Sequence, residues 1–187
     1  MNIPTRIQVP KSLRHHLQRG GLVAYPTESC YGIGCLPAHQ PALRRLIRLK
    51  KRPQHKGMIV IGAYKDQLRP LLQPLPAATE NMLAENWPAA KTFLLPVRRH
   101  LPPLLRGKGR TKLAVRVPDH AGSRSLCSRL QTALVSTSCN RAGKRACKSR
   151  REVWRQFGRD VWIIGGQVGR YRQPSQIIDG ETGRRLR

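Results

Sequence analysis

The chain has 187 residues, with 36 Lys plus Arg against 9 Asp plus Glu, which gives a formal net charge of +27. This length fits one α/β domain and leaves no room for a second large core, while a hydrophobic share of 39% excludes a globally disordered chain. The charge favours a polyanionic partner, and a basic surface kept for solubility is the alternative.

The first half of the chain predicts helices and strands in alternation. Residues 11–19 predict a short helix that ends at a Gly-Gly pair. The apolar run 22–25 predicts a strand, so the segment PTES that follows stands at a strand end. Residues 39–50 predict an amphipathic helix, 58–61 a buried strand, and 65–86 a Pro-rich helical stretch without fixed boundaries.

The second half continues this pattern. Residues 92–97 and 113–117 predict strands separated by a basic loop, and 122–130 predict a helix. The strand expected at 133–137 runs directly into Ser138, Cys139 and Asn140. Residues 141–151 carry six cations and no acid, so we expect a solvated loop or helix start rather than core.

The C-terminal part predicts a helix at 153–157, strands at 161–164 and 176–178, and a polar tail from Gly180. Alternating strands and helices indicate an α/β sandwich, and late strands joined by short turns favour a mixed parallel and antiparallel sheet. We therefore predict a single domain over 1–187, with a recognisable core at about 20–180.

Cysteine usage and hydropathy predict a soluble cytoplasmic protein. No CxxC pair is present, so neither a disulfide framework nor a zinc ribbon is expected. The N-terminal segment lacks the apolar stretch of a signal peptide, and no window has the length of a membrane span. The five cysteines are Cys30, Cys35, Cys127, Cys139 and Cys147.

The acidic residues exclude several reaction classes. Asp179 and Glu181 are the one close pair among nine carboxylates, which disfavours a two-carboxylate hydrolase or a dense two-metal site. The six histidines form no metal pattern, so no metal site is predicted. Catalysis should depend on cations, as in phosphoryl and nucleotidyl transfer.

The segment LIRLKKRPQHKG carries the first candidate site. It brings Lys50, Arg52 and Lys56 out of a helix end into a turn stiffened by Pro, where three cations would clamp a triphosphate. The alternative is that basic residues at a helix C-terminus only complement its dipole.

Three further motifs offer ligands at strand ends. STSCN, residues 136–140, groups hydroxyls and an amide that suit phosphate or carboxylate oxygens, or that cap a helix. PTESCYGIG, residues 26–34, presents Thr27 among glycines that permit close approach, or forms a simple turn. Arg116, in an apolar strand, needs an anionic partner or a solvated face. Cys139 lacks a His partner and is expected to be a packing residue.

Together these motifs resemble the YrdC/TsaC family of threonylcarbamoyl-AMP synthases. PTESCYGIG, KKRPQHKG, LAVRVPDH and STSCN follow one another in the family order, and PSQI at 174–177 is similar to its closing strand. The resemblance spans about residues 20–180 and implies a twisted mixed sheet, flanked by helices, with a concave basic face.

The resemblance also implies a reaction. Threonine takes up bicarbonate as a carbamate, which attacks the α-phosphate of ATP and expels pyrophosphate. The adenylate then passes to a separate threonylcarbamoyl-transferase complex that modifies the tRNA adenosine beside the anticodon. Mg²⁺ is expected with the ATP.

Residue by residue, the resemblance makes Lys50 and Arg52 catalytic. The implied ATP-binding set is Lys50, Arg52, Lys56, Lys112, Ser138, Asn140 and Ser175. The implied threonine-binding set is Thr27, Arg116 and Ser136. Two departures lie in the STSCN region, where Cys139 replaces a small residue and residues 141–143 replace Leu-Ser-Gly.

A rival interpretation makes the positive face itself the function. A non-catalytic RNA-binding or ribosome-assembly protein would also explain the +27 charge and the basic run 141–151. Both interpretations hold together if affinity for tRNA helps to deliver the product.

Overall fold

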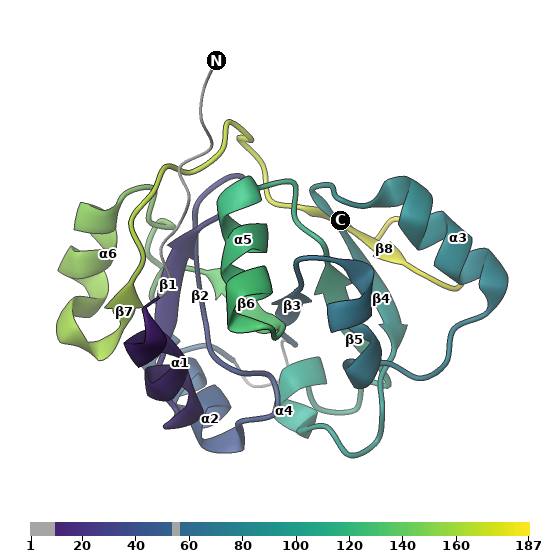
Figure 1. Cartoon of the computed structure of the whole chain (residues 1–187), viewed down its shortest axis with the longest axis horizontal. Helices are drawn as coiled ribbons and strands as arrows, with labels where there is room; N and C mark the ends of the chain where they lie inside the picture. The colour runs from purple at the N-terminus through teal and green to yellow at the C-terminus, as the bar shows by residue number, and fades with distance from the viewer. Residues whose placement is uncertain (1–9, 54–56) are drawn as a thin grey trace.

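The computed structural model describes residues 10–53 and 57–187. Over these residues the strands form one sheet in the order β7-β1-β2-β6-β3-β5-β4-β8, with both parallel and antiparallel neighbours (Figure 1). The predicted mixed sheet is therefore confirmed. The strands are β1 (Val23–Pro26), β2 (Tyr31–Gly34), β3 (Ile59–Ile61), β4 (Lys91–Pro96), β5 (Lys112–Arg116), β6 (Leu134–Ser138), β7 (Trp162–Ile163) and β8 (Gln176–Asp179).

The helices pack on both faces of the sheet, with α6 beside β7 at one end and α3 near β4 and β8 at the other (Figure 1). The α-helices are α1 (Lys11–Gln18), α2 (Gln40–Lys50), α3 (Ala77–Asn86), α4 (Pro103–Arg106), α5 (Ala121–Leu130) and α6 (Arg150–Phe157). The short 3-10 helices are η1 (Lys65–Gln67), η2 (Arg69–Leu71) and η3 (Gly158–Asp160).

Side-chain alternation along the strands divides the core into two clusters. Val60, Val115 and Phe93 point to one face, where they pack with residues of α2, α3, α4 and α6. Ile61 and Leu134 point to the opposite face, where α1 and α5 cover them. In Figure 1, α5 lies across the strands on this second face.

Where α1 and α5 do not cover it, the second face carries polar and small side chains. One row of neighbours in register runs from Ser136 to Ile59, Ala114 and Leu94, and ends at Asp179 of β8. Arg116 lies on the same face, two residues beyond Ala114 and opposite Ile61. Polar and small side chains from distant segments thus share this face, where a site can form.

The end of α2 illustrates how local sequence sets the site. Four apolar residues of α2 are buried, as its amphipathic pattern predicts. The Nδ1 atom of His39 accepts a hydrogen bond from the Ala42 amide at 3.2 Å and caps the N-terminus. Lys51 adopts the left-handed conformation, with φ at 51°, and ends the helix.

Three elements depart from the sequence expectations, and one of them is α4, which forms within the stretch expected to be a basic loop. The stretch 65–86 is divided into η1, η2 and α3, because prolines interrupt it. The segment YGIG forms β2 between β1 and β6, although its two glycines suggest a turn. A Cβ on Gly34 would lie 1.6 Å from the Val135 carbonyl oxygen, so this glycine permits close strand approach. No helix of the described residues is long and apolar enough to span a bilayer.

Candidate active site

A cavity of about 580 Å³ opens on the second face of the sheet. Its apolar floor consists of Ile59, Ala114, Leu94 and Ile177, from β3, β5, β4 and β8. Its five cations come from three separate stretches of the chain: Arg52, then Arg106, Arg110 and Lys112, then Arg187. A cavity with an apolar floor and several convergent cations suits a ligand that combines a flat apolar group with an anionic chain.

Lys50, the last residue of α2, points into the fold rather than into solvent. Its side chain is 3% exposed. Its ammonium donates to the Ser138 carbonyl oxygen and, at 2.8 Å, to the Asn140 carbonyl oxygen. Burial lowers the pKa of Lys50 to about 8. The structure therefore brings together Lys50, Ser138 and Asn140, which sequence reasoning placed in one set.

The segment after β6 is held in a fixed loop by its own side chains. The Ser138 hydroxyl donates to Asn140 Oδ1 at 2.7 Å, and Asn140 Nδ2 donates to the Lys144 carbonyl oxygen at 2.8 Å. Cys139 is fully buried, which supports its expected packing role. This arrangement leaves the exposed hydroxyl of Ser138 beside a buried positive charge.

The basic run 141–151 is not uniformly solvated, which corrects the sequence expectation. Cys147 is buried, and its amide donates to the Cys139 carbonyl oxygen at 2.8 Å. Arg141 donates to the Leu49 carbonyl oxygen at 3.2 Å, and its guanidinium lies 5.4 Å from the centre of the Phe157 ring. The run thus fastens the STSCN loop to α2 and α6. The sequence expectation was wrong because local charge does not reveal these distant partners.

Arg52 lines the cavity two residues beyond the helix end. Its Nη2 atom donates to the Gly57 carbonyl oxygen at 2.8 Å. Its Nε atom is buried and has no hydrogen-bond partner within 10–53 and 57–187. Burial also lowers the pKa of Arg52. Lys56, the third cation predicted for this turn, lies outside the described residues.

The residues predicted to bind threonine gather at one end of the same face. A Cβ on Gly32 would lie 2.9 Å from Ser136 Oγ and 3.2 Å from Thr27 Cγ2, so the absent side chain leaves these two residues close together. Thr27 Oγ1 donates to the Cys30 carbonyl oxygen at 2.8 Å. Arg116 is 7% exposed, and its Nη1 atom lies 3.2 Å from Glu28 Oε1.

Lys112 and Ser175 both have polar partners of their own, and of the two only Lys112 lines the cavity. Lys112 lines the cavity, but its ammonium contacts both Asp179, at 2.7 Å, and Glu181, at 2.5 Å. These contacts raise the pKa of Lys112 and lower that of Asp179. Ser175 shares a hydrogen bond of 2.8 Å with Thr92. A phosphate would have to displace the carboxylates before Lys112 could bind it.

Sequence reasoning missed Arg187, Arg106 and Arg110. Arg187 lines the cavity and donates through Nε and Nη2 to the Ser175 carbonyl oxygen, at 3.3 and 3.0 Å. Its main chain is fixed by hydrogen bonds to Ile177. No local signal marks these arginines in a chain with 36 cations, since only the pairing of the tail with β8 places Arg187 at the site.

Comparison with known proteins shows the family to which this chain belongs. Residues 15–187 match the Sua5/YciO/YrdC family, described as "Telomere recombination". A threonylcarbamoyl-AMP synthase of Neisseria meningitidis serogroup B is 66% identical over 177 residues, which cover 95% of this chain and 94% of that protein. The threonylcarbamoyl-AMP synthase of Chromobacterium violaceum is 51% identical and is covered to 90% of its length.

Solved structures share the fold. The structure of P. abyssi Sua5 complexed with L-threonine matches with a TM-score of 0.80 and 29% identity. The match covers 90% of this chain and 49% of that one, so the present chain spans about half of the longer Sua5 chain. E. coli YciO matches with a TM-score of 0.76 and 23% identity, which supports the fold alone. On the extent of these matches, this chain belongs to the Sua5/YciO/YrdC family.

Proposed function

We propose that this chain is a threonylcarbamoyl-AMP synthase, which forms threonylcarbamoyl-AMP and pyrophosphate from L-threonine, bicarbonate and ATP. The carrying observation is that a cavity lined by cations lies on the same sheet face as Thr27, Ser136 and Arg116. The close relatives named threonylcarbamoyl-AMP synthase, which match over nearly their whole length, support the assignment.

The reaction requires a threonine site and an ATP site next to each other. The amine of threonine forms a C–N bond to the carbon of bicarbonate and loses a proton, with release of water. An oxygen of the resulting carbamate then forms a bond to the α-phosphorus of ATP, and the bond to pyrophosphate breaks. Arg116 would bind the threonine carboxylate, with Thr27 and Ser136 beside it. Arg52 would offset the charge that grows on the departing pyrophosphate.

The nucleotide would lie over the apolar floor with its phosphates among the cations. Ser138 and Asn140 would contact the phosphate chain, held in place by Lys50. Lys112 and Ser175 would join them at the other wall, and Lys56 stays a prediction from the motif alone. Within the described residues no three His, Cys, Asp or Glu side chains group as a metal site. These residues do not form a protein-built Mg²⁺ site, so we expect Mg²⁺ to be bound by ATP itself.

The decisive test is mass detection of threonylcarbamoyl-AMP from the purified protein. Product and pyrophosphate should appear together, and both should require threonine and bicarbonate. Serine at the same concentration should give much less product. Equal product with serine would contradict threonine specificity, and no adenylate with any combination would overturn the proposed function.

The depressed pKa of Lys50 predicts that ATP binds more weakly at alkaline pH. With a pKa of about 8 the ammonium is mostly charged at pH 7 and mostly neutral at pH 9. An unfolded lysine titrates near 10.5, so the unfolded chain holds more protons between these values. The stability contributed by Lys50 therefore rises from pH 8 to 10.5 while its charge is lost.

We expect the ATP dissociation constant, measured by calorimetry, to increase as the pH rises through about 8. The Lys50→Met variant should lose this dependence. Because the Cys147 thiol lies nearby and its pKa is lowered, Cys147→Ser serves as the control and should keep it. An affinity that stays constant to pH 9.5 in the native protein would contradict the role of the Lys50 charge.

A second candidate function, RNA binding, is favoured by a groove beside α6. The groove has a volume of about 830 Å³, and none of the residues that line it also lines the cavity. One of its aromatic residues, Trp154, is 55% exposed. It is lined by Arg150, Arg151, Trp154, Val161, Trp162 and Ile163. An exposed indole between arginines is the combination that stacks on bases of single-stranded RNA and neutralises its phosphates.

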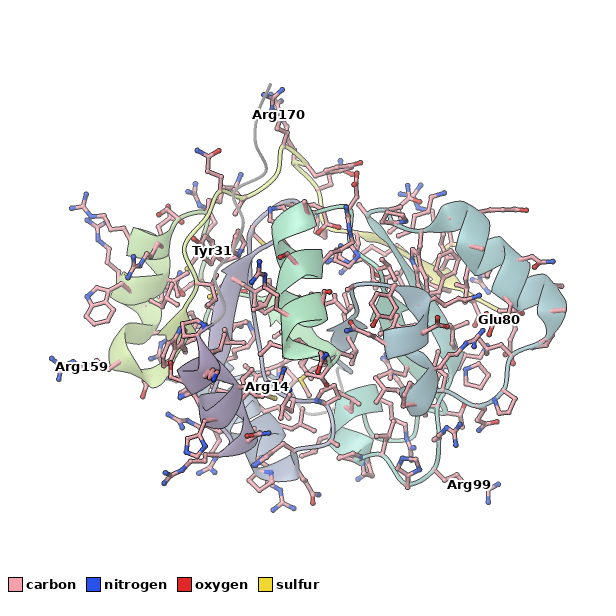
Figure 2. All side chains as sticks on the ribbon, in the orientation of Figure 1. Arg14, Tyr31, Glu80, Arg99, Arg159 and Arg170 are labelled. Carbon is pink, nitrogen blue, oxygen red and sulfur yellow. The ribbon has the colours of Figure 1, made fainter. Side chains whose placement is uncertain are left out.

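The positive charge is also spread over the surface rather than confined to the cavity. Figure 2 shows Arg99, Arg159 and Arg170 at three separate edges of the fold. Such a distribution would attract tRNA without specifying a sequence. We propose that the protein acts in the cytoplasm, binds tRNA weakly, and passes the adenylate to a threonylcarbamoyl-transferase complex.

Replacing Trp154 with alanine should weaken the binding of a single-stranded oligoribonucleotide about 5- to 100-fold, the value of one stacked base. The salt dependence should stay the same, because the indole is uncharged. Changing both Arg150 and Arg151 to glutamine should reduce the slope of log affinity against log salt by about 1.4. Tyr64, which is 53% exposed on another surface, provides the control Tyr64→Ala. Equal losses in Trp154→Ala and Tyr64→Ala, in fluorescence anisotropy titrations, would exclude this groove.

A further inference from the structure

A buried ion pair stands at the threonine end of the site. Glu28 lies two residues beyond the end of β1, and Arg116 is the last residue of β5. The two side chains are 2% and 8% exposed, and they meet through Arg116 Nη1 and Glu28 Oε1 at 3.2 Å. Removing two charges from water costs several kcal/mol per ion. An arrangement this costly needs a reason beyond fold stability.

The pair is incomplete in a way that leaves the arginine available. A purely structural Arg–carboxylate pair is commonly bidentate, with two parallel hydrogen bonds. Here the closest contact joins Arg116 Nη1 to Glu28 Oε1 at 3.2 Å, and the Nε and Oε2 atoms add no second hydrogen bond to it. Arg116 Nε and Glu28 Oε2 are both buried, and neither has a hydrogen-bond partner among residues 10–53 and 57–187. Buried donors are almost always satisfied, so a missing partner for Arg116 is informative.

Glu28 itself is held firmly. Its Oε1 atom also accepts a hydrogen bond from the Asp119 amide at 3.0 Å. Its carbonyl oxygen accepts from the Tyr171 amide at 3.2 Å. A Cβ on Gly169 would lie 2.6 Å from that same oxygen, so the segment that joins β7 to β8 packs directly on the Glu28 main chain. Neither the backbone nor the carboxylate of Glu28 is free to follow Arg116.

Arg116 needs such a support because another cation lies near it. Burial lowers the pKa of Arg187, and repulsion from the nearby charge of Arg116 lowers it further. Without Glu28, Arg116 would turn toward solvent and away from Arg187. Glu28 at one edge of the planar guanidinium restricts its orientation and leaves Nε without a partner among the described residues.

We propose that Glu28 is a positioning residue for the amino-acid substrate, which fixes Arg116 by one edge so that the remaining edge receives the α-carboxylate of threonine. This inference rests on the proposed function and deepens it, since it states why Arg116 is ready for a carboxylate before the substrate arrives. The substrate carboxylate would provide the hydrogen-bond acceptors that Arg116 lacks. Glu28 acts through Arg116 and takes no part in bond making.

The test compares Glu28→Ala with Glu28→Gln in adenylate formation. Glu28→Ala should raise the KM for threonine about 10- to 100-fold, as expected when a buried charged group loses its partner, and should leave the KM for ATP unchanged. Glu28→Gln keeps an oxygen at the same reach and should restore most of the threonine affinity. Glu80→Ala, which breaks the contacts of Glu80 with Lys65 and Arg69 elsewhere in the fold, is the matched control.

A probe without a carboxylate separates direct from indirect action. L-Threoninamide, measured as a competitive inhibitor, should bind the native protein and Glu28→Ala equally. If its affinity falls as much as that of threonine, Glu28 contacts the substrate amine directly and the proposal is wrong. Should Glu28→Ala fail to fold, Glu28→Asp keeps the charge but not the reach, and its threonine KM must also rise.

The outcomes distinguish this inference from the proposed function. A native protein that forms no adenylate overturns the proposed function. A native protein that forms it, with unchanged threonine KM in both Glu28→Ala and Glu28→Asp, overturns only the role of Glu28. Equal rises in the KM values for threonine and ATP would indicate a structural role and would also overturn the positioning role.

Discussion

Replacing Lys50 with alanine should reduce the rate of threonylcarbamoyl-AMP formation by about 1,000-fold, the effect expected when a fixed charge beside a reacting phosphate is lost. Two losses combine. The positive charge next to Ser138 disappears, and the carbonyl oxygens of Ser138 and Asn140 lose their common donor. The loop that presents the Ser138 hydroxyl would then lose one of its contacts with α2, while Arg141 and the Ala142 amide would still hold it there.

The neighbour Lys51 provides the control for Lys50. Lys51 is exposed and ends α2 in the left-handed conformation. Lys51→Gln should have nearly native kinetics, because its ammonium has no role in the proposed site. Thermal unfolding of both variants separates loss of catalysis from loss of fold. Near-native turnover in a folded Lys50→Ala protein would remove Lys50 from the mechanism.

Replacing Arg52 with alanine should lower kcat by about 100- to 1,000-fold and raise the KM for ATP. Arg52 lines the cavity, and its buried Nε atom has no partner among the described residues. A departing pyrophosphate would supply the missing acceptor. The guanidinium would then gain a hydrogen bond as charge develops, which is the condition for stabilising a transition state more than a ground state.

Arg52→Lys refines this test. Lysine keeps the charge but not the planar fork, so it should recover only part of the lost rate. Arg48→Ala, one turn earlier on the exposed face of α2, should leave pyrophosphate release unchanged. If Arg52→Ala and Arg48→Ala gave equal rates in a coupled pyrophosphate assay, the cavity would not be the site of phosphate chemistry.

Much of the fold follows from local pattern. Helix α2 begins and ends within one residue of the range 39–50, which apolar spacing and Pro53 predict. The strands β1, β4, β5 and β6 lie at the expected apolar runs. These positions are predicted correctly because the period of buried side chains is a property of neighbouring residues. The sequence did not predict β2, because the need for glycine at position 34 comes from the close approach of β6, which is distant in the chain.

The candidate site divides in the same way. Motif order alone grouped Lys50 with Ser138 and Asn140, and the structure brings these residues into contact. Composition could not show that Lys112 is paired with Asp179 and Glu181. Those partners lie 67 and 69 residues away in the chain and become neighbours because β5 and β8 pair with opposite edges of β4, which brings their side chains to the same face of the sheet.

By itself, then, the sequence determined the classes of chemistry that this protein can perform: many cations, few carboxylates, and motifs at strand ends that bind anions. The tertiary structure decided which of 36 cations serve a site. It turned Lys50 inward, brought Arg187 to the cavity and set Glu28 against Arg116. The physical reason is that charge and hydrogen-bonding capacity belong to single residues, whereas a binding site depends on distances between strands whose order in the sheet differs from their order in the chain.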